Sequence, residues 1–368
     1  MNPAMKVTTF FRQDAVVLTA VSAAVLALSS ARAQTPGSEL PTGFANINIA
    51  AGSGTAKKTT LVSIPLLEDV RITGKATGRI TGVGANTITS TGAGWSAGQL
   101  STPTAPYFLE ITSGAAQGRI FQLSTATANT ADMVTIDAGE ATRTGNLTTL
   151  GIVADATNGD TYRLWPADTL GSFFGTPETT GIQGGATAAA ADTVTLVANG
   201  SAVTYFYNTG VTPARWSRVG LGGGTDAGNV AILPYTGVQY ARLANTPLQF
   251  RVLGRMPAGQ RKVAIKNSGT TLLSPYWPVS QTLGQLGLHD LPGWVSSTTV
   301  AAADTVALTA NGSVTTYYHD GNSWRRVGLG AGSSDAVTVP VGASVLINKK
   351  GSAPGFTTYE HTAPYSLQ

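Results

Sequence analysis

Two stretches of the chain repeat one another so closely that both are expected to fold in the same way. Residues 186–206 align without gaps on residues 298–318, and 14 of the 21 positions are identical. The same spacing of 112 residues relates two Trp-Pro pairs that precede these stretches. A repeat at a fixed period indicates a structural unit that recurs along the chain. We therefore predict two tandem modules, at residues 165–276 and 277–368.

The repeats have the composition of strands and turns. Only 11% of the residues are charged, and Thr, Ser, Asn and Gly supply most of the polarity. In each copy an Ala-Asp-Thr-Val segment leads to an Asn-Gly pair, at Asn199 and Asn311, and a second strand-like segment returns. Asn-Gly allows positive φ at both turn positions and is typical of hairpins.

Short strand-like segments separated by turn residues also fill residues 61–164. The hydrophobic content of 42% argues against a disordered chain, and the absence of cysteine excludes a disulfide scaffold. The sequence predicts an all-β protein with an N-terminal β domain at 61–164, followed by the two homologous tandem β-modules. Each module is expected to be of sandwich or small-barrel type.

The first 33 residues have the pattern of a secretory signal peptide. Lys6 and Arg12 precede an apolar stretch from Ala15 to Leu28, and Ala31-Arg32-Ala33 supplies small residues around a cleavage site. A membrane anchor is the alternative, although an apolar stretch of this length falls short of the roughly 20 residues that a spanning helix needs. We expect an exported protein, located outside the cell, at its surface or in the periplasm.

Removal of the signal peptide lowers the charge imbalance of the chain. The mature chain would keep 20 basic and 18 acidic residues. This balance argues against a nucleic-acid partner. No later segment is long and apolar enough to suggest a membrane span in the mature chain.

Residues 34–60 are rich in Gly, Ala, Ser and Thr, and we predict a flexible lead segment. Within it, residues 45–50 alternate small or apolar with polar residues, which predicts a strand. Such a strand could complete the sheet of a neighbouring copy and produce self-assembly.

The order of the repeated motifs resembles a family of secreted, repeat-containing β-rich bacterial proteins known from automatic sequence models. The motifs are a Trp-Pro segment followed by Thr-Leu-Gly, the Ala-Asp-Thr-Val strand, and a Trp-x-Arg-Val-Gly strand that begins at Trp216 and Trp324. Gly94-Trp95 and the segment from Tyr107 to Ile111 extend the resemblance into the N-terminal region. The resemblance implies export and a shared architecture, and it implies no activity or cofactor.

One segment matches the sequence pattern of a catalytic serine in part. Gly94-Trp95-Ser96-Ala97-Gly98 matches the pattern of a nucleophile elbow, but Pro103 and Pro106 prevent the long helix that must follow it. With only three His residues for a triad, we predict a glycine-rich turn around a packed Trp95 and no enzyme activity.

Metal binding has one candidate loop. Asp155, Asn158 and Asp160 offer oxygen ligands for calcium, although the loop lacks the terminal Glu of known calcium loops. The alternative, which we favour, is a turn in which Asp and Asn accept hydrogen bonds from their own backbone. Asp192 and Asp304 occupy equivalent positions before a strand, and we predict that they cap backbone groups. We predict no metal and no cofactor.

Aromatic residues of the repeats are the best candidates for ligand binding. The candidates are Tyr205, Tyr207, Tyr317, Trp216 and Trp324. Exposed tyrosines could stack on sugars, whereas the two tryptophans are expected to anchor the cores of their modules. Arg218 and Arg326 follow each Trp by two residues, and we expect them to stack or to pair with Asp192 and Asp304.

Three functions therefore remain open at the level of sequence. The leading hypothesis is a secreted or surface protein with a structural or adhesive role and no catalysis. The second is an extracellular carbohydrate-binding protein that uses exposed aromatics and binds surface polysaccharide. The third is a self-assembling surface fibre subunit, a homo-oligomer formed by strand addition.

Overall fold

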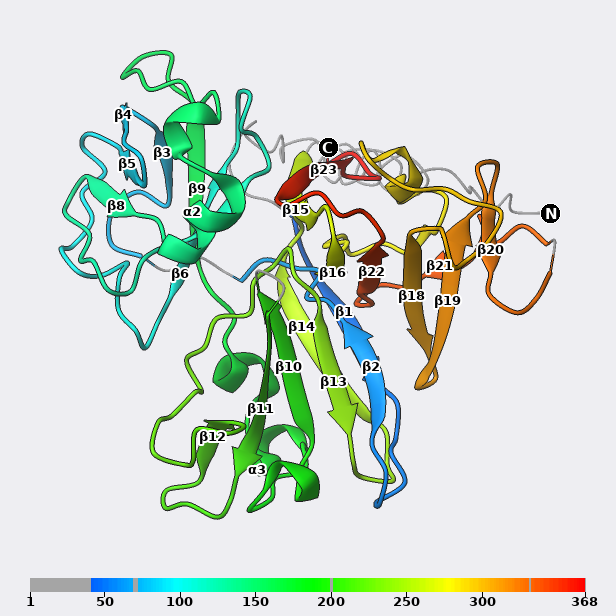
Figure 1. Ribbon diagram of the computed structural model, residues 1–368. Helices are drawn as coiled ribbons and strands as arrows, with labels where there is room; N and C mark the ends of the chain where they lie inside the picture. Colours follow the sequence, from blue (N-terminus) through cyan, green and yellow to red (C-terminus); the bar gives the residue numbers. More distant parts are fainter. Residues whose placement is uncertain (1–40, 69–71, 199–200, 331, 368) are drawn as a thin grey trace, which may run out of the picture. The chain divides into compact units, whose positions relative to one another are not determined.

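The computed structural model describes residues 41–68, 72–198, 201–330 and 332–367, and most of its regular structure is antiparallel β-sheet (Figure 1). The all-β class predicted from the sequence is confirmed. Helical segments are short, with bounds α2 (Ala138–Thr144), α3 (Pro177–Thr180), η1 (Leu147–Thr149), η2 (Leu170–Phe174), η3 (Ala188–Ala190) and η4 (Leu288–Asp290). The predicted signal peptide and the Asn199 turn lie outside the described residues.

Two five-stranded sheets are built from equivalent strands. In the first sheet the order is β12 (Arg215–Arg218), β11 (Ser201–Asn208), β10 (Thr193–Ala198), β13 (Val238–Arg242) and β2 (Lys58–Val62). In the second sheet the order is β20 (Trp324–Arg326), β19 (Ser313–His319), β18 (Thr305–Ala310), β22 (Val345–Lys349) and β16 (Gly269–Leu273).

The strands of the two sheets pair in the same register. Val194 lies opposite Tyr205 in the first sheet, and Val306 lies opposite Tyr317 in the second. At the tip of the second hairpin, Asn311 has φ 51° and Gly312 has φ 74°. Positive φ at both positions is the conformation that the predicted Asn-Gly hairpin turn requires.

The segment predicted to be a flexible lead instead completes the first sheet. β1 (Thr42–Ile49) pairs over its whole length with β14 (Leu248–Arg255), and β2 forms the edge of the first sheet. Ala45, Ile47 and Ile49 are buried on β1. The prediction of flexibility is therefore wrong for residues 42–49 and 58–60, which form paired strands, and the strand predicted at 45–50 is present. Its alternation buries every second residue, and the Gly- and Ser-rich residues only connect the two strands.

Two strands that correspond to β1 and β2, namely β15 (Gln260–Lys266) and β16, come before the other strands of the second sheet in the sequence. β15 pairs with β23 (Phe356–Thr362), as β1 pairs with β14, and β16 forms the sheet edge that β2 forms in the first sheet. The predicted boundary at residue 277 thus separates β15 from its partner β23, and β16 from the second sheet. The sequence contained a signal for this relation, because Thr59–Ser63 and Thr270–Ser274 are identical at four of five positions.

The two edge strands reach across to the opposite sheet in a reciprocal way. Leu61 of β2 accepts a hydrogen bond from the N–H of Ser344 at 3.2 Å, and Leu272 of β16 accepts one from the N–H of Gly237 at 2.9 Å. The neighbouring bridges, Val62 with Ala343 and Leu273 with Thr236, are equivalent as well. Such reciprocal contacts are those of a twofold interface, here formed within one chain.

Residues 72–166 form a separate group of strands that the chain inserts between β2 and the rest of the first sheet. One sheet has the order β3 (Thr77–Arg79), β9 (Thr161–Pro166), β6 (Tyr107–Ile111) and β7 (Ile120–Gln122), and the other β4 (Gly82–Val83), β5 (Thr87–Thr89) and β8 (Met133–Thr135). Their core contains the buried Trp95, Phe121 and Tyr162. The predicted strand at residues 70–73 falls mainly outside the described residues.

A buried carboxylate ties this inserted region to β15. Glu110 on β6 pairs with Arg163 on β9 at 2.5 Å and with Arg261 on β15. Burial alone would raise the pKa of Glu110, but Arg261 and Arg163 outweigh this effect and hold the pKa below its usual range. The carboxylate therefore stays charged between two guanidinium groups.

We expect Glu110→Gln to lower the free energy of unfolding by about 3–5 kcal/mol, because it leaves two buried cations without their shared anion. Urea unfolding of the two proteins at pH 7 measures the difference. Glu360→Gln is the matched control, since Glu360 pairs with Lys262 at the surface and should contribute at most about 1 kcal/mol. Equal effects of the two substitutions would contradict the role assigned to Glu110.

Deletion of residues 34–60 should abolish cooperative unfolding of the chain. The deletion removes β1 and part of β2, so that β13 and β14 lose their hydrogen-bonded neighbours. Circular dichroism against temperature measures the transition. A truncated protein that unfolds with the same midpoint as the full chain would show that these strands are dispensable.

Candidate binding groove between the two sheets

A groove lies where β1 and β2 meet the β18–β19 hairpin. Its volume is about 520 Å³, which is within the range of ligand-binding clefts. It is lined by Asn46–Ala50, Thr60, Leu61, Pro247, Leu308–Gly312, Thr315, Tyr317, Val337, Thr338 and Pro340–Ala343. The groove therefore depends on the association of the two sheets.

The lining of the groove is neutral and partly polar. None of the residues that line it is Asp, Glu, Lys or Arg, and Lys58 stands beside it at Gly312. Asn46 and Asn48 lie on the exposed side of β1, where the alternation of the strand places every second residue. Uncharged hydroxyl and amide groups beside apolar surface suit an uncharged polar ligand.

Existing hydrogen bonds hold several of these polar side chains in place. Asn48 accepts a hydrogen bond from the side chain of Gln249 at 2.8 Å. Thr309 accepts one from the N–H of Leu61 at 2.8 Å, and Thr60 accepts one from the N–H of Ala50 at 3.2 Å. The groove is thus preorganised, which lowers the entropic cost of binding a ligand.

On the other side of the twofold relation, the inserted region divides the equivalent site into two smaller cavities. About 30 Å³ remains beside Arg143, Tyr235 and Leu272, and about 330 Å³ remains over Leu196 and Tyr205 beside Pro103. The guanidinium of Arg143 on α2 lies 4.1 Å from the centre of the Tyr235 ring, and the Tyr235 hydroxyl donates to Glu140. No inserted region follows β16, and the groove at Asn46 is undivided.

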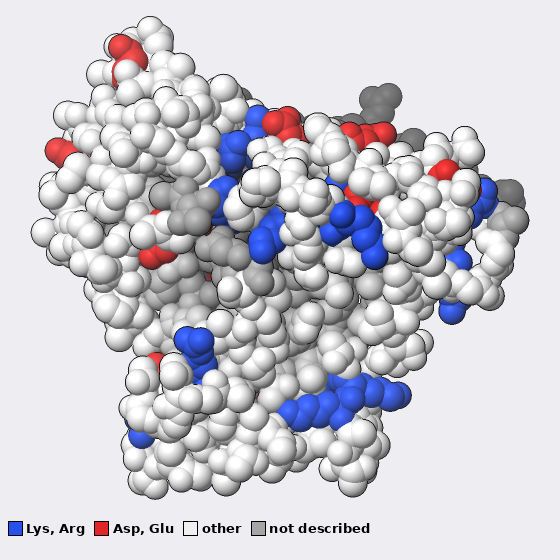
Figure 2. All heavy atoms as spheres, in the orientation of Figure 1, with Lys and Arg blue, Asp and Glu red and all other residues white. Residues whose placement is uncertain are grey.

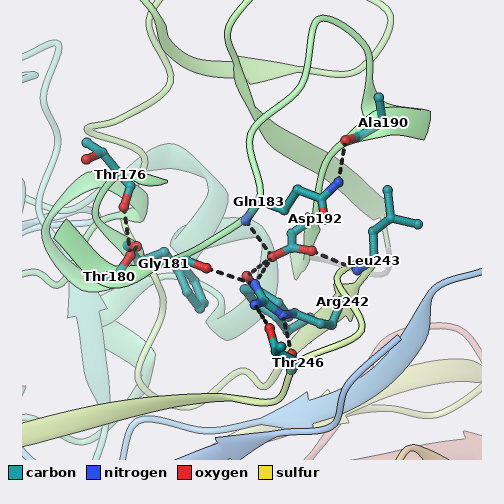
Figure 3. A network of polar contacts seen from close by, with 11 residues as sticks. Thr176, Thr180, Gly181, Gln183, Ala190, Asp192, Arg242, Leu243 and Thr246 are labelled. Carbon is teal, nitrogen blue, oxygen red and sulfur yellow. Dashed lines mark hydrogen bonds and ion pairs between the residues drawn. The ribbon is translucent and has the colours of Figure 1, made fainter. Parts of the chain in front are cut away.

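A buried ion pair fixes the start of β10, and its equivalent fixes the start of β18. Figure 3 shows Asp192 between Arg242, at 2.6 Å, and the N–H groups of Gln183 and Leu243, at 2.8 and 2.7 Å. In the second sheet Asp304 pairs with Lys349 at 2.7 Å and accepts from the N–H groups of Val295 and Lys350. The predicted backbone caps are therefore confirmed at both positions.

The sequence did not identify the cations of these pairs. Arg218 and Arg326 were expected to pair with Asp192 and Asp304, but both arginines are exposed. Arg242 and Lys349 take this role because they lie on β13 and β22, which are the direct neighbours of β10 and β18. Strand order decides this choice, and the local sequence does not contain it.

The predicted aromatic residues occupy different environments. Tyr317 lines the groove, but it is buried, as are Tyr205, Trp216 and Trp324. The expectation of exposed tyrosines is wrong for Tyr205 and Tyr317, because their faces of β11 and β19 pack into the core. The expectation that both tryptophans anchor the core agrees with their burial.

Tyr207 and Trp216 line a second cleft of about 490 Å³ at the other end of the first sheet. Tyr207 is half-buried, and its ring meets Trp216 edge-on at 6.1 Å. Glu68, Arg215 and Asp226 also line this cleft. The charges distinguish it from the neutral groove, so the two sites suit different ligands.

Trp324 packs against two histidines, His289 on η4 and His319 on β19. His289 stacks on His319 with 4.4 Å between ring centres, and both rings meet Trp324 edge-on. Burial lowers the pKa of His319, and the neighbouring His289 lowers it further. The equivalent of His319 in the first sheet is Tyr207, so the repeats have diverged at this position.

The remaining sequence candidates form structural turns. No helix follows Ser96, and the indole N–H of Trp95 donates to the carbonyl of Lys75 at 3.0 Å. Asp155 accepts from the N–H groups of Thr157 and Asn158 at 2.7 and 2.6 Å, which is the turn that we favoured over calcium binding. Across the described ranges, no three His, Cys, Asp or Glu side chains form a group that could hold a metal ion.

Comparison with known proteins supplies no relative. No family model matches the sequence, and no curated protein matches it. In the part of the chain that the structure describes, no helix has the length and apolar character needed to cross a membrane.

Asp168, next to the second cleft, should make stability depend on pH. Burial, with a smaller effect of Glu68, raises the pKa of Asp168 to about 7. The folded state therefore binds this proton more tightly than the unfolded state, and stability is lost as the pH rises from about 4 through about 7. We expect Asp168→Asn to stabilise the protein at pH 8, by on the order of 1–3 kcal/mol.

Urea unfolding at pH 8 and pH 5 measures this effect, which should shrink at the lower pH. Asp226→Asn is the control, because Asp226 lines the same cleft but is exposed. An Asp168→Asn protein less stable than the parent at pH 8 would refute the prediction.

Proposed function

We propose that this is an exported, non-catalytic binding protein with an adhesive role, which holds an uncharged carbohydrate in the groove between the two sheets. The observation that carries the proposal is the neutral, hydrogen-bonding lining of this groove. Sugars present hydroxyl groups and apolar ring faces, and Asn, Thr and Tyr side chains match both. The pattern of the first 33 residues supports export, as does the resemblance to secreted β-rich proteins.

The distribution of charge supports an uncharged ligand. Figure 2 shows a face made mostly of uncharged residues, with Lys and Arg in small separate groups. No broad field of one sign is visible there that would attract a polyanion over long range. Affinity would therefore come from short-range contacts in the groove.

Strand addition between copies receives less support than carbohydrate binding. The strand proposed for this role, β1, already pairs with β14 over its eight residues. An incoming strand could use only the other edge of β1. Light scattering of the mature protein distinguishes the two proposals, since carbohydrate binding needs no assembly.

We expect Thr338→Arg to weaken the binding of neutral oligosaccharides. The affinity should fall by at least about tenfold, which corresponds to 1.4 kcal/mol. Thr338 is exposed on β21 (Thr338–Val339), where β21 pairs with β17 (Gln281–Thr282), and it lines the groove. A long cationic side chain at this position would fill the groove and introduce a charge. Titration calorimetry with a panel of soluble neutral and acidic glycans measures the loss.

Thr225→Arg is the matched control, since Thr225 is exposed and lies outside the groove. The control should bind like the parent protein, and all three proteins should unfold at similar temperatures. Failure of every neutral glycan to bind the parent would reject the proposal, as would equal binding by the two Arg variants.

A further inference from the structure

A small cavity lies where β15, the residues that follow β16 and the inserted region meet. Its volume is about 10 Å³, which leaves room for one small ion or water molecule and for no organic ligand. Gly118 and Ile120 of the inserted region line one side, and Arg261, Ser274 and Tyr276 line the other. This cavity is distinct from both larger clefts.

Four polar atoms around the cavity have no hydrogen-bond partner, and each of them can donate a hydrogen bond. Nε and Nη2 of Arg261, the hydroxyl of Ser274 and the hydroxyl of Tyr276 are buried and have no hydrogen-bond partner in the protein. The three residues are only 3%, 2% and 3% exposed. Buried polar atoms almost always have a partner, and guanidinium N–H groups can only donate. The cavity therefore needs an acceptor.

The charge around the cavity is positive. Arg261 and Arg163 share Glu110 as their carboxylate, which leaves one positive charge in excess. Neither Asp nor Glu is among the residues that line the cavity; Lys262 lines it but pairs with Glu360, so Arg261 is the cation that matters here. Burial raises the pKa of Tyr276, so its hydroxyl keeps a proton to donate. An uncompensated buried cation is costly, and an anion would offset that cost.

We infer that this cavity binds one small monovalent anion of halide size, held by the guanidinium of Arg261 and the hydroxyls of Ser274 and Tyr276. The anion completes the neutralisation of the two arginines around Glu110. It thereby stabilises the contact between the inserted region and β15, which Glu110 also bridges. This site is independent of carbohydrate binding in the groove.

The test compares thermal unfolding of the mature protein in sodium chloride, sodium bromide and sodium gluconate at equal ionic strength. A ligand bound only by the folded state raises the unfolding temperature in a saturable way. We expect the unfolding temperature in chloride and in bromide to be about 2 °C or more above that in gluconate. Gluconate is the reference because this anion is too large for the cavity. Equal unfolding temperatures in the three salts would show that water alone occupies the cavity and would overturn the inference.

Two variants separate this site from general salt effects. Ser274→Ala and Tyr276→Phe each remove one donor without altering the ion pairs of Glu110, and each should reduce the difference between chloride and gluconate. Ser217→Ala is the matched control, because Ser217 is a buried serine without a partner that lies far along the chain on β12. A halide effect that persists unchanged in both variants would refute the site, as would the absence of an anomalous bromide peak in the cavity of crystals grown in bromide.

Discussion

The structure depends on reciprocal hydrogen bonds between the edge strand of each sheet and the opposite sheet. β2 completes the first sheet and bonds to the second, while β16 completes the second and bonds to the first. An edge strand exposes unpaired N–H and C=O groups, and such edges invite aggregation. By joining the two edges within one chain, the fold satisfies these groups and brings two equivalent halves together. The groove between the halves is a direct result of this arrangement.

The two halves are nearly symmetric, but they differ around their equivalent sites. The buried ion pair is kept in both, as Asp192 with Arg242 and as Asp304 with Lys349. The inserted region follows only β2, and it divides one of the two equivalent sites between the sheets into smaller cavities. The other site stays open and offers neutral polar groups. The same insertion creates the contact at Glu110 and the donor-lined cavity beside Arg261.

The environments of the aromatic residues illustrate how local pattern and packing diverge. Alternation on a strand shows which residues share a face, and it correctly separated Tyr205 from Phe206. It does not show whether that face meets the core or solvent. Tyr205 and Phe206 are in fact both buried, because the first sheet is covered on part of both faces. The best candidate site is therefore lined mainly by Asn and Thr, which carry no distinctive sequence pattern.

The sequence by itself determined the all-β class, the recurring hairpins with their Asn-Gly turn at Asn311, and the capping role of Asp192 and Asp304. These features are local, because turn conformation and strand alternation depend on residues that are close along the chain. Tertiary structure alone decided that β1 pairs with β14 while β2 completes the first sheet, that Arg242 and Lys349 neutralise the two aspartates, and that a groove opens at Asn46. Each of these depends on strand order, which brings together residues more than 40 positions apart.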